Sequence, residues 1–179
     1  MRGIRPSSTE HAEYYKDYVA MVPDGEITDI LERQIHETIS LMDTTSERQG
    51  EYRYASDKWT VKEVLGHMAD TERVMSYRLL AFGRGDTAQL PGFEEDRYVR
   101  DASFNQQTME ELKKNLLAVR NSTVQLLRSF NEDAWSRSGT ANGSIVSVNA
   151  LAYIIAGHEL HHRSILKERY VGAEAYPKE

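Results

Sequence analysis

The sequence contains no cysteine, and this absence excludes several kinds of chemistry. Without cysteine the chain cannot form a disulfide, a thiolate nucleophile or a cysteine-ligated zinc site. A chain without disulfides is compatible with a reducing compartment. The first residues, MRGIRPSSTEHAEYYKDY, also lack the apolar segment of a secretory signal. We therefore expect a cytoplasmic protein.

Long apolar runs and blocks of positive charge are also missing. No run approaches the roughly 18 apolar residues that span a bilayer, so we expect no association with a membrane. Lys and Arg total 22 against 28 Asp and Glu, which gives a formal net charge of −6. Because phosphate binding needs clustered Lys and Arg, this balance argues against nucleic acid as a partner.

The sequence does contain four long stretches with apolar residues at helical spacing, at 27–42, 60–82, 108–130 and 147–170. We find no convincing pair of strands, no repeat and no linker that divides the chain. An all-α four-helix bundle is therefore predicted. We expect one domain, residues 1–179, in which residues 1–22 are an N-terminal extension packing on the bundle.

Two connections are long enough to have a function of their own. The segment 83–107 is irregular by sequence, and loops of this length inside a compact domain are more often functional than idle. The connection 131–144 carries turn chemistry at Asn142-Gly143. We expect these two segments to form the walls of a substrate pocket.

The last helical stretch contains three histidines within five residues. At about 100° per residue, His158 and His162 fall in the same sector, roughly 80° wide, as the apolar residues of the buried face. His161 lies about 100° away from His162 and cannot share its direction. Two imidazoles four residues apart on one face can bind a single metal ion. This helix therefore carries the candidate site.

The same residues spell H-E-x-x-H, the signature of a zinc-protease helix in which the glutamate is a general base. The extended form of that motif, with a glycine turn and a third histidine, is absent from 163–170. We therefore give little weight to a peptidase. Glu159 stays a candidate catalytic residue, because it lies about 100° from His158 and could reach either the cavity edge or a neighbouring helix.

A metal that keeps an open coordination position needs a third protein ligand. His67 lies about 100° from the centre of the apolar stripe of its helix and shares that flank with Thr71 and Arg78. The flank is either the edge of a polar cavity or exposed surface, and the spacing alone leaves both open. Asp70, one turn later, is the second catalytic candidate, with a surface salt bridge as the equal alternative.

An ordered set of motifs resembles the DinB/YfiT-like superfamily. The set comprises Tyr54, Lys58-Trp59, Gly66-His67-Met68-Ala69-Asp70-Thr71-Glu72-Arg73, Leu90-Pro91-Gly92-Phe93 and Gly157-His158-Glu159-Leu160-His161-His162. The resemblance extends over most of the chain. It implies an up-down-down-up four-helix bundle with a three-histidine divalent metal site. Carried over, the ligands are His67, His158 and His162.

The resemblance also implies a range of activities. Nickel or zinc is typical of such sites, with iron or manganese as alternatives, and several members are thiol-dependent transferases or isomerases that use bacillithiol, mycothiol or glutathione. We expect a small-molecule substrate and a metal-dependent transferase or hydrolase, and any sulfur nucleophile must arrive as a low-molecular-weight thiol. A non-catalytic metal-binding stress-response protein is the alternative. Family members often form dimers, so a homodimer is a further expectation.

Overall fold

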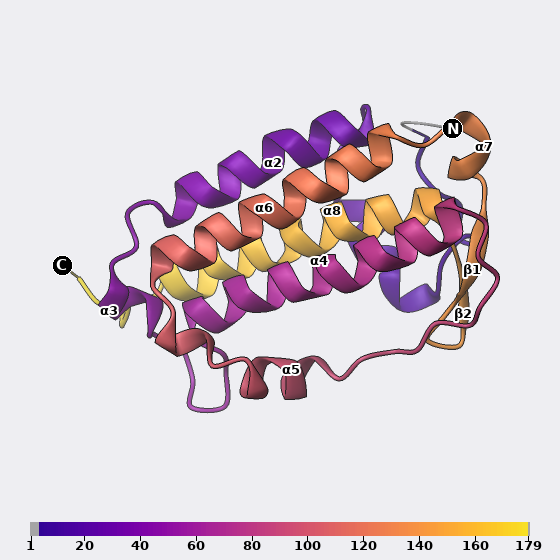
Figure 1. The fold of residues 1–179 in the computed structure, drawn as a ribbon. Coiled ribbons are helices and arrows are strands. Elements are labelled where there is room, and N and C mark those ends of the chain that lie inside the picture. The colour runs from indigo at the N-terminus through magenta and orange to yellow at the C-terminus, as the bar shows by residue number, and fades with distance from the viewer. Residues whose placement is uncertain (1–3, 179) are drawn as a thin grey trace.

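Four long helices lie side by side in the computed structural model, which describes residues 4–178 (Figure 1). These helices are α2 (Ile27–Met42), α4 (Val61–Gly83), α6 (Met109–Arg128) and α8 (Val148–Ile165). The all-α bundle expected from the apolar spacing is therefore confirmed. Residues 1–3 and 179 of the expected domain lie outside the described residues. Within 4–178, no helix combines the length and the apolar character needed to cross a bilayer.

The order of helix directions is up-down-down-up, as the resemblance implied. α2 and α8 run one way along the bundle, and α4 and α6 run the other way (Figure 1). α4 packs against both α6 and α8, and α2 closes the bundle on the other side of the same two helices. Because α4 and α6 are parallel, the connection between them must return along the whole bundle. That connection contains α5 (Glu95–Asp101) and a short 3₁₀ turn (Phe104–Gln106).

Side-chain caps fix where two of these helices begin. The Thr60 hydroxyl accepts a hydrogen bond from the Glu63 amide at 3.1 Å, and the Glu63 carboxylate accepts one from the Thr60 amide at 2.7 Å. Thr108 and Glu111 form the same reciprocal pair. Each of these capping boxes satisfies amides that a helix N-terminus would otherwise leave unpaired.

A small β-hairpin contradicts the expectation that the chain has no pair of strands. β1 (Ser138–Ala141) and β2 (Ser144–Ser147) pair antiparallel. Asn142 and Gly143 connect them with φ angles of 51° and 74°, as a two-residue hairpin turn requires. Each strand has four residues, most of them small, so neither shows the alternating apolar pattern that identifies a strand. The turn was predicted, but the strands were missed.

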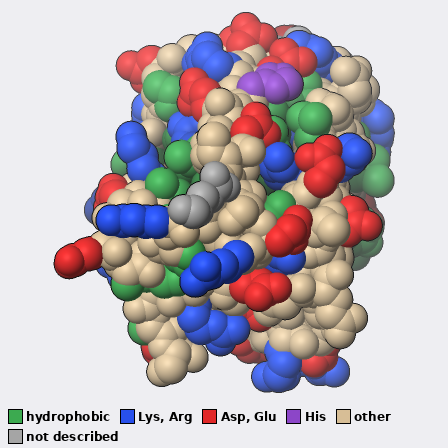
Figure 2. Space-filling view, turned by 90° about the vertical axis from the view of Figure 1, so that its left-hand side faces the viewer, with side chains coloured by type: hydrophobic (Ala, Val, Ile, Leu, Met, Phe, Trp, Pro, Cys, Tyr) green, Lys and Arg blue, Asp and Glu red, His purple; other side chains and the backbone are tan. Residues whose placement is uncertain are grey.

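Shorter elements cover the ends and one side of the bundle. They are a 3₁₀ turn (Glu13–Tyr15), α1 (Lys16–Met21), α3 (Glu47–Gly50), α7 (Glu132–Trp135) and a π-helical turn (Leu166–Val171) that continues α8. Figure 2 views the end of the bundle that carries α3 and the C-terminal segment. On this face acidic and basic side chains are interspersed, without a large patch of either charge.

The N-terminal segment packs directly on α8. A Cβ atom at Gly157 would lie only 2.0 Å from the carbonyl oxygen of Tyr18, so the glycine is what allows the two backbones to approach. The Arg5 guanidinium donates hydrogen bonds to the carbonyls of Val19 and Val22, which holds the end of α1. This packing places the Tyr18 ring beside His158, with the two ring centroids 5.7 Å apart.

Candidate metal centre

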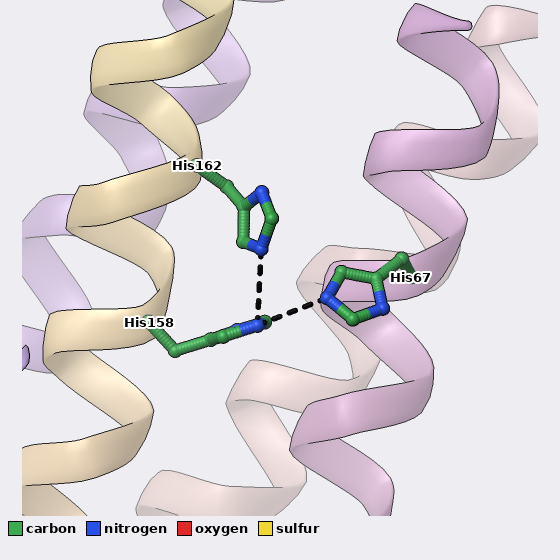
Figure 3. Close-up of side chains that lie close together, drawn as sticks. All are labelled: His67, His158 and His162. Atoms are coloured by element: carbon green, nitrogen blue, oxygen red, sulfur yellow. Dashed lines mark hydrogen bonds between the residues drawn. The ribbon is translucent and has the colours of Figure 1, made fainter. Parts of the chain in front are cut away.

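Three histidine side chains converge between α4 and α8. His67 comes from α4, and His158 and His162 come from successive turns of α8 (Figure 3). The Nε2 atom of His158 lies 3.0 Å from Nε2 of His67 and 3.1 Å from Nε2 of His162. One ligand atom from each residue lies within 4.8 Å of the other two. Imidazole nitrogens that share a metal ion at about 2.0–2.1 Å are roughly 3 to 3.5 Å apart, so the two spacings at His158 suit a common ion.

The contacts at His158 cannot both be hydrogen bonds. An imidazole nitrogen carries either one in-plane proton or one in-plane lone pair, so it can make one well-aligned hydrogen bond but not two. His158 Nε2 nevertheless faces two further Nε2 atoms at hydrogen-bonding distance. A cation at the point of convergence would accept a lone pair from all three. The donor set therefore fits a divalent metal better than it fits a network of core histidines.

Burial keeps these imidazoles in the neutral form that binds metal. It lowers the pKa of His67 to about 4, and the neighbouring His161 lowers it further in the same direction. Burial, followed by the surrounding histidines, also places the pKa of His158 and that of His162 well below the usual range. At neutral pH all three nitrogens are therefore free of the extra proton that would compete with a metal.

Aromatic and hydroxyl groups surround the three rings. The Trp59 ring packs on His67 with centroids 4.6 Å apart, and Tyr18 covers His158 from the side of α1. The Thr71 hydroxyl, one turn after His67, lies 3.4 Å from His67 Nδ1. His67 is only 2% exposed. The cavity interpretation of its flank is therefore correct, and the exposed-surface interpretation is wrong.

Glu159 belongs to a buried polar network behind the histidines and does not point at them. Its carboxylate accepts hydrogen bonds from Gln34, Thr38 and Arg120, at 2.5, 2.5 and 2.6 Å. Arg120 also pairs with Glu72, and the side chains of this ion-pair network are at most 4% exposed. Burial alone would lower the pKa of Arg120, but Glu72 and Glu159 outweigh it and raise the pKa. Glu159 is thus placed to hold helices together.

Asp70 and the remaining histidines lie apart from the cluster. The Asp70 carboxylate accepts a hydrogen bond from Arg73 at 3.0 Å on the outer side of α4, the salt bridge weighed above. His36 is exposed on α2. His161 is partly buried and packs between the rings of Tyr18 and His162. His11 is buried at the N-terminal segment, where its Nδ1 lies 2.9 Å from the carbonyl of Ala12.

Two separate cavities adjoin the histidine cluster. One, of about 160 Å³, lies beside His158, and its wall includes Tyr18, Arg78, Phe93 and Asn142. As expected, both long connections contribute to this wall, through Phe93 and Asn142 respectively. The second, of about 290 Å³, lies beside His162 and is lined by Trp59, Lys58 and Tyr170, among others.

Sequence reasoning did not identify every residue of these walls. Thr71 and Arg78 were noted on the flank of His67, but the aromatic contribution of α1 was missed, because nothing in the sequence says which helix α1 covers. Arg120 was missed as the partner of Glu72 and Glu159 for the same reason. Each of these three residues lies on a different long helix.

Residues 30–166 match the family described as the DinB superfamily. Among solved structures, YfiT from Bacillus subtilis, described as a probable metal-dependent hydrolase with an unusual four-helix bundle topology, is 16% identical with a TM-score of 0.71. The match covers 92% of this chain and 90% of YfiT. No curated protein sequence matches the chain significantly.

Two further structures share the fold. A mycothiol-dependent maleylpyruvate isomerase is 16% identical with a TM-score of 0.66, over 84% of this chain and 63% of the isomerase. A DinB-like protein, YjoA, from Bacillus subtilis is 21% identical with a TM-score of 0.59, over 85% of this chain and 95% of YjoA. At these identities the likeness is one of fold.

Proposed function

This chain belongs to the DinB superfamily, and from that premise we propose that His67, His158 and His162 bind one divalent metal ion at the active site of a small-molecule enzyme. The observation that carries the proposal is the convergence of three neutral Nε2 atoms, because those of His67 and His162 both approach that of His158 and hydrogen bonding alone cannot satisfy all of them. Nickel or zinc suits an all-imidazole donor set best, with iron or manganese as alternatives.

A bound divalent ion would act as a Lewis acid that lowers the pKa of a bound water or thiol towards neutrality. The protein residues supply the rest. Three neutral ligands leave the full positive charge of the site uncompensated by protein. Trp59 and Tyr18 pack on the His67 and His158 rings and restrict how those rings can turn. Thr71 lies close enough to His67 Nδ1 to orient the ring.

A thiol-dependent transferase is the favoured reaction class, and the two cavities support it. A transferase must hold a thiol and an acceptor at once, and cavities beside His158 and beside His162 offer separate places for them. The structural neighbour that depends on mycothiol and the one described as a hydrolase are compatible with either class. A metal-dependent hydrolase, which needs one cavity only, is the second candidate.

Metal content of untagged protein tests the centre. Inductively coupled plasma mass spectrometry should find about one nickel, zinc, iron or manganese ion per chain. His67→Ala, His158→Ala and His162→Ala should each lose it, because every ligand is required. His36→Ala, on the exposed face of α2, is the matched control and should keep it. No metal in the parent protein, and no uptake when these ions are added, would overturn the proposal.

Turnover separates the enzyme from a non-catalytic metal-binding protein. The metal-loaded protein should transfer bacillithiol, mycothiol or glutathione to an electrophilic acceptor, with loss of the activity in His158→Ala. Hydrolysis of ester and amide substrates is assayed on the same preparation. A protein that holds its metal but shows neither reaction would favour the stress-response alternative.

A further inference from the structure

The cavity beside His158 contains a buried cation for which residues 4–178 provide no counter-ion. Arg78, on α4, is 3% exposed and lines this cavity. Its guanidinium donates to the carbonyl of Pro91 at 2.8 Å and faces the Met75 sulfur, a weak acceptor, at 3.4 Å. No acidic side chain within residues 4–178 forms an ion pair with it. Arg120, which is as deeply buried, is paired with two carboxylates.

A buried charge without a partner is costly, so the absence of a counter-ion needs a reason. Glu95 lines the same cavity, but much of its side chain is exposed. Its partial burial, followed by the neighbouring Asp96 and Glu94, raises its pKa, whereas a guanidinium in contact would lower that pKa. The pKa of Tyr15 is also raised, by burial and by Tyr14, in spite of the opposing effect of Arg78. Tyr15 is therefore a neutral phenol at physiological pH and cannot be the missing anion.

We propose that Arg78 binds the carboxylate group of the substrate, so that the cavity beside His158 selects small monocarboxylic acids. The aromatic rings of Tyr15, Tyr18 and Phe93 line the same cavity and would contact the apolar part of such a molecule. The volume of about 160 Å³ is close to that of an engineered cavity that holds benzene, so a substituted benzene is of suitable size. The inference rests on the proposed function, because it treats this cavity as the substrate pocket of the metal centre.

Arg78 lies apart from the three histidines, so the carboxylate would be bound at a different place from the proposed metal centre. Arg78 lies eleven residues after His67 on α4, about three helical turns, and it lines the same cavity as His158. A carboxylate on Arg78 would therefore leave the rest of the molecule to face His158. A single guanidinium with the Glu95 carboxylate in the same cavity suits a monoanion better than a phosphate dianion.

Binding of charged and neutral isosteres to the metal-loaded protein tests the proposal. Isothermal titration calorimetry is run with benzoate, phenylacetate and hexanoate, and with the corresponding amides. At least one acid should bind the parent protein about 10-fold or more tightly than its amide, because a charged hydrogen bond to a buried guanidinium is lost in the amide. Inorganic phosphate is titrated as the competing anion.

Variants then assign the preference to Arg78. Arg78→Met should remove the difference between acid and amide, and Arg78→Lys should restore part of it. Arg73→Met, on the exposed side of the same helix, is the matched control and should leave it unchanged. Circular dichroism and the melting temperature establish that each variant is folded. If Arg78→Met does not fold, the comparison of acid and amide on the parent protein and on Arg78→Lys still decides the question.

Three results would overturn the inference. They are no binding of any of the acids, equal affinity for acid and amide, or an unchanged preference in Arg78→Met. Tighter, Arg78-dependent binding of phosphate would overturn the carboxylate assignment. Metal content is measured on every sample. Each of these results would therefore count against the role of Arg78 and not against the metal centre. Absence of metal from the parent protein would overturn the proposed function itself.

Discussion

At the scale of single residues, the histidine centre makes the stability of the metal-free protein depend on pH. His67 takes up a proton at about pH 6.5 in the unfolded chain but only at about pH 4 in the folded protein. Its contribution to stability is therefore complete above pH 6.5 and is lost as the pH falls towards 4. By pH 5 the loss from this residue alone should be on the order of 2 kcal/mol.

Urea unfolding of the metal-free protein at pH 7.5 and at pH 5.0 measures this loss. In His67→Gln, which cannot take up the proton, the difference between the two pH values should be smaller by about 2 kcal/mol. His36→Gln, at an exposed position, serves as the control. An unchanged pH difference in His67→Gln would show that the folded protein does not hold His67 in the neutral form.

Arg120 is the residue whose loss should damage the fold most. Its guanidinium is shared between Glu72 and Glu159, and removing it leaves two buried carboxylates facing each other. Arg120→Met should therefore lower the free energy of unfolding by about 3–5 kcal/mol. Arg128→Met, on the same helix, breaks the half-exposed pair with Glu32 and should cost less than about 1 kcal/mol. Equal effects in urea unfolding would show that Arg120 is not structurally essential.

At the scale of elements, the contact between α1 and α8 depends on a glycine, Gly157, because it has no side chain. A methyl group at Gly157 would collide with the Tyr18 carbonyl, so one of the two backbones would have to shift. Gly157→Ala should lower the free energy of unfolding by about 1–3 kcal/mol, even though alanine favours helix formation. Limited proteolysis should then cleave the N-terminal segment before the bundle. Parent-like stability and resistance would mean that α1 packs less closely than the structure indicates.

At the scale of the whole molecule, the metal ion would join two helices that are remote in sequence. His67 lies in α4 and the other two ligands lie in α8, so the ion would bind the folded chain and not the unfolded one. At a hundredfold excess over its dissociation constant, a bound ion should add about 2.7 kcal/mol to the free energy of unfolding. Thermal unfolding with and without nickel or zinc measures this gain. A gain that persists in His158→Ala would place the ion elsewhere.

The helices of this fold could be predicted because each leaves a signal within its own residues. Apolar spacing gave the four long helices, and Thr60 and Thr108 marked where two of them begin. The same spacing placed His158 and His162 on the buried face. Spacing could not place His67, because a residue on the flank of a stripe is buried or exposed according to which helix lies beside it. The resemblance to the superfamily supplied that information.

Features that join distant parts of the chain could not be predicted from the residues. The approach of α1 to Gly157, the Arg120 network and the unpaired guanidinium of Arg78 all depend on which helices become neighbours. The hairpin was missed for another reason. Its strands are too short to carry a pattern, and β1 continues the pairing to Leu90 of the long crossover, a contact between segments 51 residues apart.

The two cavities meet the histidine cluster from different sides, and this arrangement has a kinetic consequence. In the proposed transferase, one ligand would reach the centre past His158 and the other past His162, so neither would have to leave before the other enters. For a two-substrate reaction we expect a random-order ternary-complex mechanism, with intersecting double-reciprocal plots and product release that is independent of the order of addition.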